Sequence, residues 1–211
     1  MYLALLFLFP FLFLLFLIPF KFTIDSIITL LYAPQQILRI AGNQKLSRNH
    51  ALEHATVNVL EEKYGYRNLS GLAKEDGFQI SGQFDPYVVE DAAREGLFRL
   101  QQGENKLVVH KRCGSSMIVA NLLSAITFII LLFMTQTFSL LNVILALLLA
   151  RLLGPTIGAW VQKQFTTSAD VEGMEIIGVY TDRSNYSSPA LFSRVGGQQV
   201  FVRTRELAVK S

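Results

Sequence analysis

The first 20 residues contain no charged side chain and are almost entirely apolar. At a rise of 1.5 Å per residue, a helix of this length reaches about 30 Å, the thickness of the hydrocarbon core of a bilayer. A secretory signal peptide would carry basic residues before its apolar run, whereas the first basic residue here is Lys21. We therefore predict that residues 1–20 form an uncleaved transmembrane helix.

Two further apolar blocks lie late in the chain, at residues 117–134 and 140–161, and a short uncharged segment joins them. Each block is long enough to cross a bilayer as a helix. The short connection between them predicts that residues 117–161 form a transmembrane helical hairpin. The expected fold class is therefore an α-helical membrane protein with about three transmembrane helices.

The basic residues indicate how these helices are oriented. All 19 Lys and Arg residues lie outside residues 1–20 and 115–150. Cytoplasmic segments of membrane proteins carry an excess of Lys and Arg. We expect the N-terminus and the hairpin loop outside the cell or internal membrane, and the polar parts of the chain on the cytoplasmic side.

The segment at residues 21–44 combines apolar residues with Asp25, Arg39 and an interrupting Pro34. This mixture is typical of amphipathic helices that lie in the membrane interface. The alternative, a fourth transmembrane helix, would place the charged domain outside, against the distribution of basic residues. We predict an interfacial segment made of two helices.

The polar parts of the chain predict a small α+β domain at residues 45–116 and a β-rich cytoplasmic tail at 162–211. Within the domain, we expect helices at 48–63 and 86–102 and strands at 77–84 and 106–110. In the tail, we expect strands at 174–180 and 198–206, around a loop with Ser187, Ser188, Pro189, Gly196 and Gly197. These expectations rest on helix caps, glycine stops and alternating apolar residues.

Composition excludes several classes of function. Hydrophobic residues make up 51% of the chain and its mean hydropathy is +0.38, which is typical of a membrane protein. A net charge of only +3 gives no support to nucleic-acid binding. The single cysteine excludes an internal disulfide framework. The expected partners are the lipid bilayer and, for the helices, another membrane protein.

The string HALEH at residues 50–54 is the most informative motif. His50 and His54 lie one helical turn apart, so both imidazoles can reach a single metal ion. Glu53 lies beside them, where a carboxylate can act as general base toward a metal-bound water. The order H-x-x-E-H resembles the motif of the inverzincin metallopeptidases.

Two histidines alone do not hold zinc, so a further ligand is needed. The third histidine and the only cysteine form a second compact pair, His110 and Cys113. Four ligands would give a closed structural site, and three would leave a position open for water. Glu90 and Glu95 are alternatives, because in the inverzincins the third ligand is a downstream glutamate. If instead no metal binds, these side chains form a polar network.

Arg151 lies within the third apolar block. An ionised side chain is costly there unless it finds a partner or extends its charge to the interface. We consider two interpretations: Arg151 steadies a carboxylate or substrate oxygen near the His/Cys residues, or the helix simply becomes interfacial at this point.

Three strings in this order resemble an uncharacterised bacterial membrane family, the domain of unknown function DUF6391. They are HALEHATVNVL at 50–60, GLAKEDGFQISG at 71–82 and VHKRCGSS at 109–116, followed by the apolar hairpin. The resemblance covers residues from about 45 to 170. It implies the architecture of a membrane protein, and it brings no established activity.

Two hypotheses for function follow from the residues. The first is a zinc-dependent hydrolase, of peptidase type, at the cytoplasmic membrane face. The second is a non-catalytic assembly or scaffold protein in which the His/Cys cluster is structural.

Overall fold

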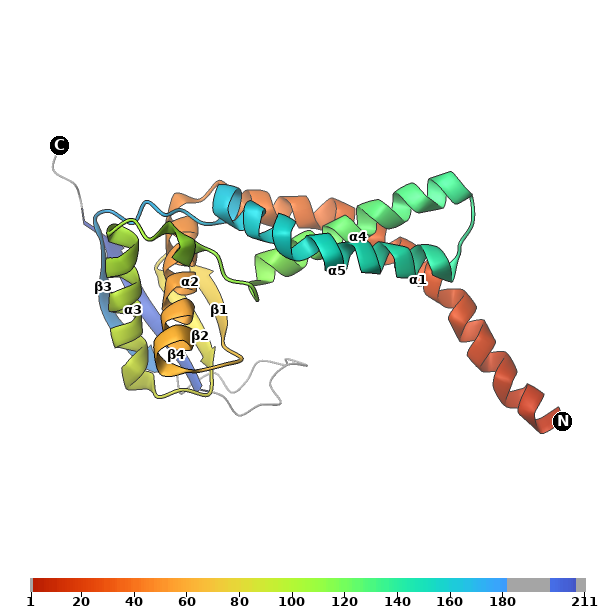
Figure 1. Ribbon diagram of the computed structural model, residues 1–211, viewed down its shortest axis with the longest axis horizontal. Coiled ribbons are helices and arrows are strands. Elements are labelled where there is room, and N and C mark those ends of the chain that lie inside the picture. The colour runs from red at the N-terminus through yellow and green to blue at the C-terminus, as the bar shows by residue number, and fades with distance from the viewer. Residues whose placement is uncertain (1, 182–197, 208–211) are drawn as a thin grey trace. The chain divides into compact units, whose positions relative to one another are not determined.

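The computed structural model describes residues 2–181 and 198–207 (Figure 1). The chain divides into two compact units. The first comprises residues 1–37 and 114–158, and the second comprises residues 38–113 and 159–211. The predicted loop residues Ser187, Ser188, Pro189, Gly196 and Gly197 lie outside the described residues.

The first unit is formed by three helices. These are most of α1 (Tyr2–Ala41), α4 (Gly114–Thr135) and most of α5 (Leu140–Val161). Stretches at Leu15–Ala41, Gly114–Thr135 and Leu140–Thr166 are long and apolar enough to cross a membrane, which confirms three candidate membrane helices among the described residues. The predicted hairpin is confirmed in its position and in its short connection.

Small residues let α4 and α5 pack closely. A Cβ atom placed on Gly154 would lie 3.0 Å from the Cβ atom of Ala120, and one on Gly158 would lie 2.9 Å from the Oγ atom of Ser116. Such close backbone approach is how apolar helices gain van der Waals contact in lipid. Helix α1 joins them through Phe22, whose ring contacts Phe128 edge-on at 4.9 Å.

The structure differs from the prediction that residues 21–44 form two separate interfacial helices. Helix α1 is continuous through this region, including Pro34. Lys21 and Asp25 form an ion pair one turn apart on this helix. Since the pair neutralises both charges locally, nothing in this stretch forces the helix to end.

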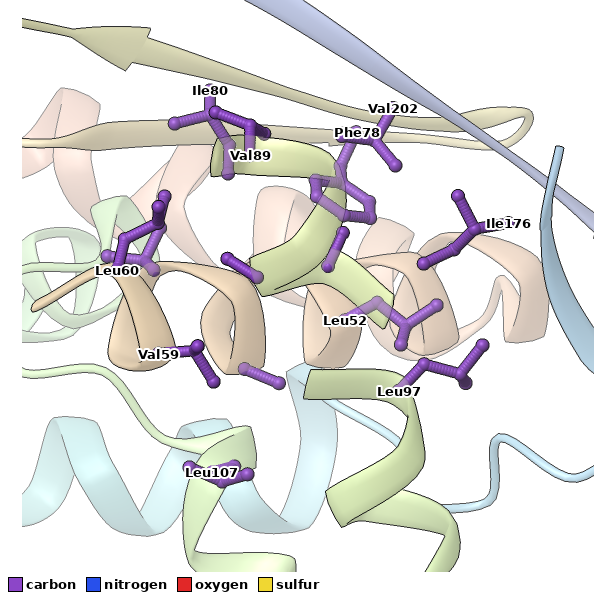
Figure 2. Close-up of a cluster of buried hydrophobic side chains, with 14 of the residues drawn as sticks. Leu52, Val59, Leu60, Phe78, Ile80, Val89, Leu97, Leu107, Ile176 and Val202 are labelled. Carbon is purple, nitrogen blue, oxygen red and sulfur yellow. The ribbon is translucent and has the colours of Figure 1, made fainter. Parts of the chain in front are cut away.

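The second unit contains a four-stranded antiparallel sheet covered by two helices. The strands are β1 (Ser70–Lys74), β2 (Gly77–Gly82), β3 (Met174–Thr181) and β4 (Gln198–Glu206), in the order β1-β2-β4-β3. The helices are α2 (Gln44–Tyr64) and α3 (Pro86–Gln101). Figure 2 shows their apolar side chains meeting those of the sheet, with Leu52, Phe78 and Val202 among them.

The predicted β-rich tail does not form a separate appendage. Residues 198–203 of β4 pair with β2, and β3 pairs with β4, so both tail strands complete the sheet of the domain. Val200 and Val202 are fully buried in the shared core. A domain of about 70 residues buries little apolar surface by itself, and these strands supply the missing part.

Residues 106–110, predicted as a strand, form part of a 3-10 helix instead, at Asn105–Val108. The physical reason is a set of side-chain hydrogen bonds from α2. The Asn58 amide donates to the carbonyl oxygens of Leu107 and Val109, both at 3.1 Å. These carbonyl groups therefore point at a helix and are not available for a β ladder.

Candidate metal centre

Helix α2 places three functional side chains on adjacent positions of one face. It begins where the Asn43 side chain accepts a hydrogen bond from the backbone N–H of Leu46, and it ends at Gly65, whose φ of 72° is the left-handed conformation that stops helices. His50, Glu53 and His54 lie in its buried first half. The helical spacing predicted from the sequence is therefore confirmed.

The imidazole of His50 is oriented by a backbone carbonyl group. Its Nδ1 atom lies 2.7 Å from the carbonyl oxygen of Thr166. A carbonyl oxygen can only accept, so Nδ1 carries a proton, and in the neutral ring Nε2 then carries the lone pair. That Nε2 atom lies 3.2 Å from the Sγ atom of Cys113.

His54 is oriented in the same way. Its Nδ1 atom lies 2.6 Å from the carbonyl oxygen of Val108, so its Nε2 atom also keeps a lone pair. This Nε2 atom is buried and has no hydrogen-bond partner among the described residues. Burial also lowers the pKa of His54 well below its usual range, which keeps the ring neutral. A buried acceptor without a partner is uncommon and calls for an explanation.

His50, His54 and Cys113 form one compact group. Each offers a ligand atom, and these atoms all lie within 4.8 Å of one another. Nitrogen and sulfur ligands approach zinc at about 2.0–2.3 Å, so neighbouring ligands of one ion are separated by roughly 3–4 Å. The three residues could therefore hold a metal ion after small side-chain movements.

Cys113 is positioned by the segment that precedes helix α4. Its backbone N–H donates to the carbonyl oxygen of His110 at 3.3 Å. The side chain of Gln162 in turn fixes His110: its Oε1 atom accepts from the His110 N–H at 2.9 Å and its Nε2 atom donates to the His110 carbonyl oxygen at 3.1 Å. Gln162 is fully buried, so both bonds are shielded from water.

Gln162 and Thr166 belong to a short π-helical segment, Gln162–Thr166, that follows α5. One holds the loop that carries Cys113, and the other orients His50. Backbone and side-chain partners of this kind fix the orientation of metal ligands. Sequence reasoning missed both residues, although Gln162 is the first polar residue after the third apolar block.

Glu53 lies beside the group. Its Oε2 atom is 3.8 Å from the Nε2 atom of His50, and the side chain is buried. Burial raises the pKa of the Glu53 carboxyl to about 8; His50 lowers it in part and Cys113 raises it. On the other side of the carboxylate lies Gly71 in strand β1, a residue that sequence reasoning did not select.

Other candidate residues lie outside this group. The Nε2 atom of His110 lies 3.5 Å from the Oε2 atom of Glu61, and the ring centroids of His110 and His54 are 6.0 Å apart. Burial lowers the pKa of His110, and Glu61 opposes that shift. His110 is therefore buried next to the group but is not one of the three residues whose ligand atoms lie close together.

The two alternative carboxylates are engaged elsewhere. Glu90 forms an ion pair with Arg94 one turn along α3, and Glu95 forms one with Lys63 of α2. Arg151 belongs to the other unit, where its side chain is exposed on α5. Its proposed role at the site stays a prediction.

Fold and site together define a class of protein: an α+β domain with a candidate three-ligand metal group, in a chain whose helices can cross a membrane. The sequence profile described as Domain of unknown function (DUF6391) matches residues 45–179, which is more than half of the chain. The chain belongs to this family, as the resemblance of its three strings indicated.

Comparison with curated proteins finds a similar uncharacterized protein from Picosynechococcus sp. The two are 38% identical over 85 residues, which cover 36% of this chain and 42% of the relative. The match therefore spans less than half of the relative's length. No solved structure matches the chain.

Proposed function

We propose that this protein is a membrane-bound zinc hydrolase of peptidase type. The observation that carries the proposal is the buried Nε2 atom of His54, which has no hydrogen-bond partner among the described residues, on a residue that forms one group with His50 and Cys113. Both imidazoles have their other nitrogen fixed on a backbone carbonyl group. This arrangement is typical of histidines that bind zinc.

The donor set favours zinc over harder cations. Two imidazole nitrogens and one thiolate are borderline to soft ligands, whereas Mg²⁺ and Ca²⁺ prefer oxygen. Three protein ligands are also the number found in catalytic zinc sites, where the fourth position holds water or substrate. The bound metal would supply Lewis-acid activation of that water.

Glu53 is the residue of this chain that would move the proton. The positive charge of a bound ion would lower the pKa of Glu53, which burial raises to about 8, and would so favour its carboxylate form. As the water oxygen forms a bond to the carbonyl carbon of a peptide, that carboxylate would accept the water proton and then give it to the leaving nitrogen when the C–N bond breaks. Its position next to the Nε2 atom of His50 supports this role. The H-x-x-E-H order supports the choice of a peptide substrate.

A second function, a closed structural metal site in a scaffold protein, is favoured by a separate observation. His50, His54 and Cys113 are all buried, and the buried ring of His110 lies beside them as a possible fourth ligand. A site with four protein ligands stabilises a fold and leaves no position for substrate. This alternative predicts the same metal content and no hydrolysis.

The test begins with the metal content of protein purified in detergent, measured for the wild type and for the His50→Ala and Cys113→Ala variants. About one zinc per wild-type chain and clear loss in both variants is expected. Less than about 0.2 zinc per chain in well-folded wild type would exclude both metal functions.

The second step separates catalysis from structure. We expect the wild type to cleave fluorescein-labelled casein and Glu53→Gln to keep its metal while losing about 100-fold or more of that activity. Glu62→Gln on the exposed side of the same helix is the matched control and should be silent. Equal activity in the wild type and Glu53→Gln, or no cleavage by the zinc-loaded wild type, would favour the scaffold function.

We also propose that the second unit faces the cytoplasm. The proposal is supported by the distribution of the 19 Lys and Arg residues, none of which lies in residues 1–20 or 115–150. In that orientation, the hairpin loop and the N-terminus lie on the opposite side.

A further inference from the structure

Gly71 in strand β1 is in unusually close contact with the Glu53 side chain. A Cβ atom built on Gly71 would lie 1.8 Å from the Oε1 atom of Glu53, 2.2 Å from its Cδ atom and 2.5 Å from its Cγ atom. Distances under 3.0 Å do not occur between such atoms in real structures. The Glu53 carboxylate therefore occupies the space that any other residue at position 71 would fill.

Backbone conformation does not explain why glycine stands at this position. Gly65 and Gly77 have φ angles of 72° and 151°, where a side chain is strained, but Gly71 is not among the residues with positive φ. It lies in a regular strand and pairs with Ile80 of β2. Among the residues that the structure describes, the contact that restricts position 71 is the one with Glu53.

A side chain at position 71 would move the carboxylate and not the backbone. Strand β1 is held by its pairing with β2, and α2 is packed in the core, whereas the atoms of Glu53 that collide are the end of a flexible side chain. The cheapest response is a change of the Glu53 side-chain torsion angles. That rotation would take the carboxylate away from its place beside the Nε2 atom of His50.

We infer that Gly71 is a positioning residue. Because it has no side chain, it leaves the space in which the Glu53 carboxylate lies next to the group formed by His50, His54 and Cys113. The inference rests on the proposed function, because Glu53 acts as a general base only when a metal is bound. The contact itself can be tested without any metal.

The first experiment measures thermal unfolding of the metal-free protein. Gly71→Ala should lower the unfolding temperature in the wild type and in Glu53→Gln, because glutamine keeps the atoms that collide. In Glu53→Ala those atoms are gone, so Gly71→Ala should have no further effect. Gly178→Ala, in β3 of the same sheet, meets only ordinary contacts of 3.6 Å or more and is the matched control.

The second experiment measures binding of Co²⁺ by absorption spectroscopy, with the same variants. Gly71→Ala should weaken the affinity about 10- to 100-fold, the usual effect of disturbing a group next to metal ligands, and should alter the spectrum of the bound ion. In the Glu53→Ala background, adding Gly71→Ala should change the affinity by less than about twofold.

The outcomes distinguish the inference from the proposed function. If Gly71→Ala has equal effects with and without the Glu53 side chain, the positioning role is refuted while metal binding stands. If the wild type binds no Co²⁺ and the unfolding temperatures still show coupling between the two residues, the proposed function is refuted and the contact alone remains.

Discussion

Replacing Gln162 by methionine removes the two hydrogen bonds between its side chain and the His110 backbone, with little change in side-chain volume. The lost bonds join Gln162 Oε1 to the His110 N–H and Gln162 Nε2 to the His110 carbonyl oxygen, at 2.9 and 3.1 Å. Each backbone group left buried without a partner costs about 1–3 kcal/mol. The His110 carbonyl oxygen keeps the hydrogen bond from the Cys113 N–H at 3.3 Å, so only the His110 N–H loses its partner. The free energy of unfolding should therefore fall by about 1–3 kcal/mol.

The measurement is urea unfolding of the metal-free protein in detergent, followed by circular dichroism and by the fluorescence of Trp160, the only tryptophan. Trp160 packs edge-on against Phe165 at 5.5 Å, so it reports on the same segment. Gln164→Met is the matched control, since Gln164 lies in the same π-helical segment and is exposed. If Gln162→Met lowers the free energy of unfolding by less than about 0.5 kcal/mol, or if both variants lower it equally, the hydrogen bonds from Gln162 do not stabilise the His110 backbone.

Three further predictions follow from the structure. His54→Ala should abolish binding of one Zn²⁺ per chain, whereas His110→Ala should retain it, as measured by metal analysis; equal losses would show that His110 is a ligand. Phe78→Ala should reduce the free energy of unfolding by about 3–5 kcal/mol in urea titrations, because this ring is fully buried in the core; a loss under about 1 kcal/mol would contradict that packing. In a cysteine-free background, an impermeant maleimide added to intact cells should label Thr137→Cys and not Asp91→Cys, both exposed positions; the reverse pattern would invert the proposed orientation.

The elements that the sequence predicted well are those whose signals are local. Helix α3 begins after Asp85, whose side chain accepts from the Tyr87 N–H, and Pro86 stands at its first position as predicted. The apolar hairpin was equally clear, because its length and lack of charge suffice to define it. The helical spacing of His50 and His54 is local too. Cys113 was named as a candidate from its pairing with His110, whereas its approach to the two histidines depends on the fold.

The parts that were missed depend on contacts between distant segments. Strand β1 is exposed at four of its five residues, so no alternation of apolar residues marked it. Residues 106–110 were predicted as a strand, but the Asn58 side chain of α2 donates to the carbonyl oxygens of Leu107 and Val109. Gly71 matters through its contact with Glu53, which no local pattern in a single sequence records.

The segments that complete the candidate site flank the apolar hairpin in the sequence. Cys113 is the last residue before α4, and Gln162 and Thr166 directly follow α5, so the two ends of the apolar hairpin deliver the ligand and the groups that orient it. A metal held by Cys113 and by His50 would tie the segment just before α4 to α2, while the hydrogen bond from His50 to Thr166 ties the segment just after α5 to the same helix, all within the second unit. Metal binding would therefore stabilise both connections at once, because binding to the folded state alone adds to its free energy of unfolding. This coupling holds for a catalytic ion as for a structural one, so a fall in stability on metal removal identifies the site, and only the Glu53→Gln variant identifies the chemistry.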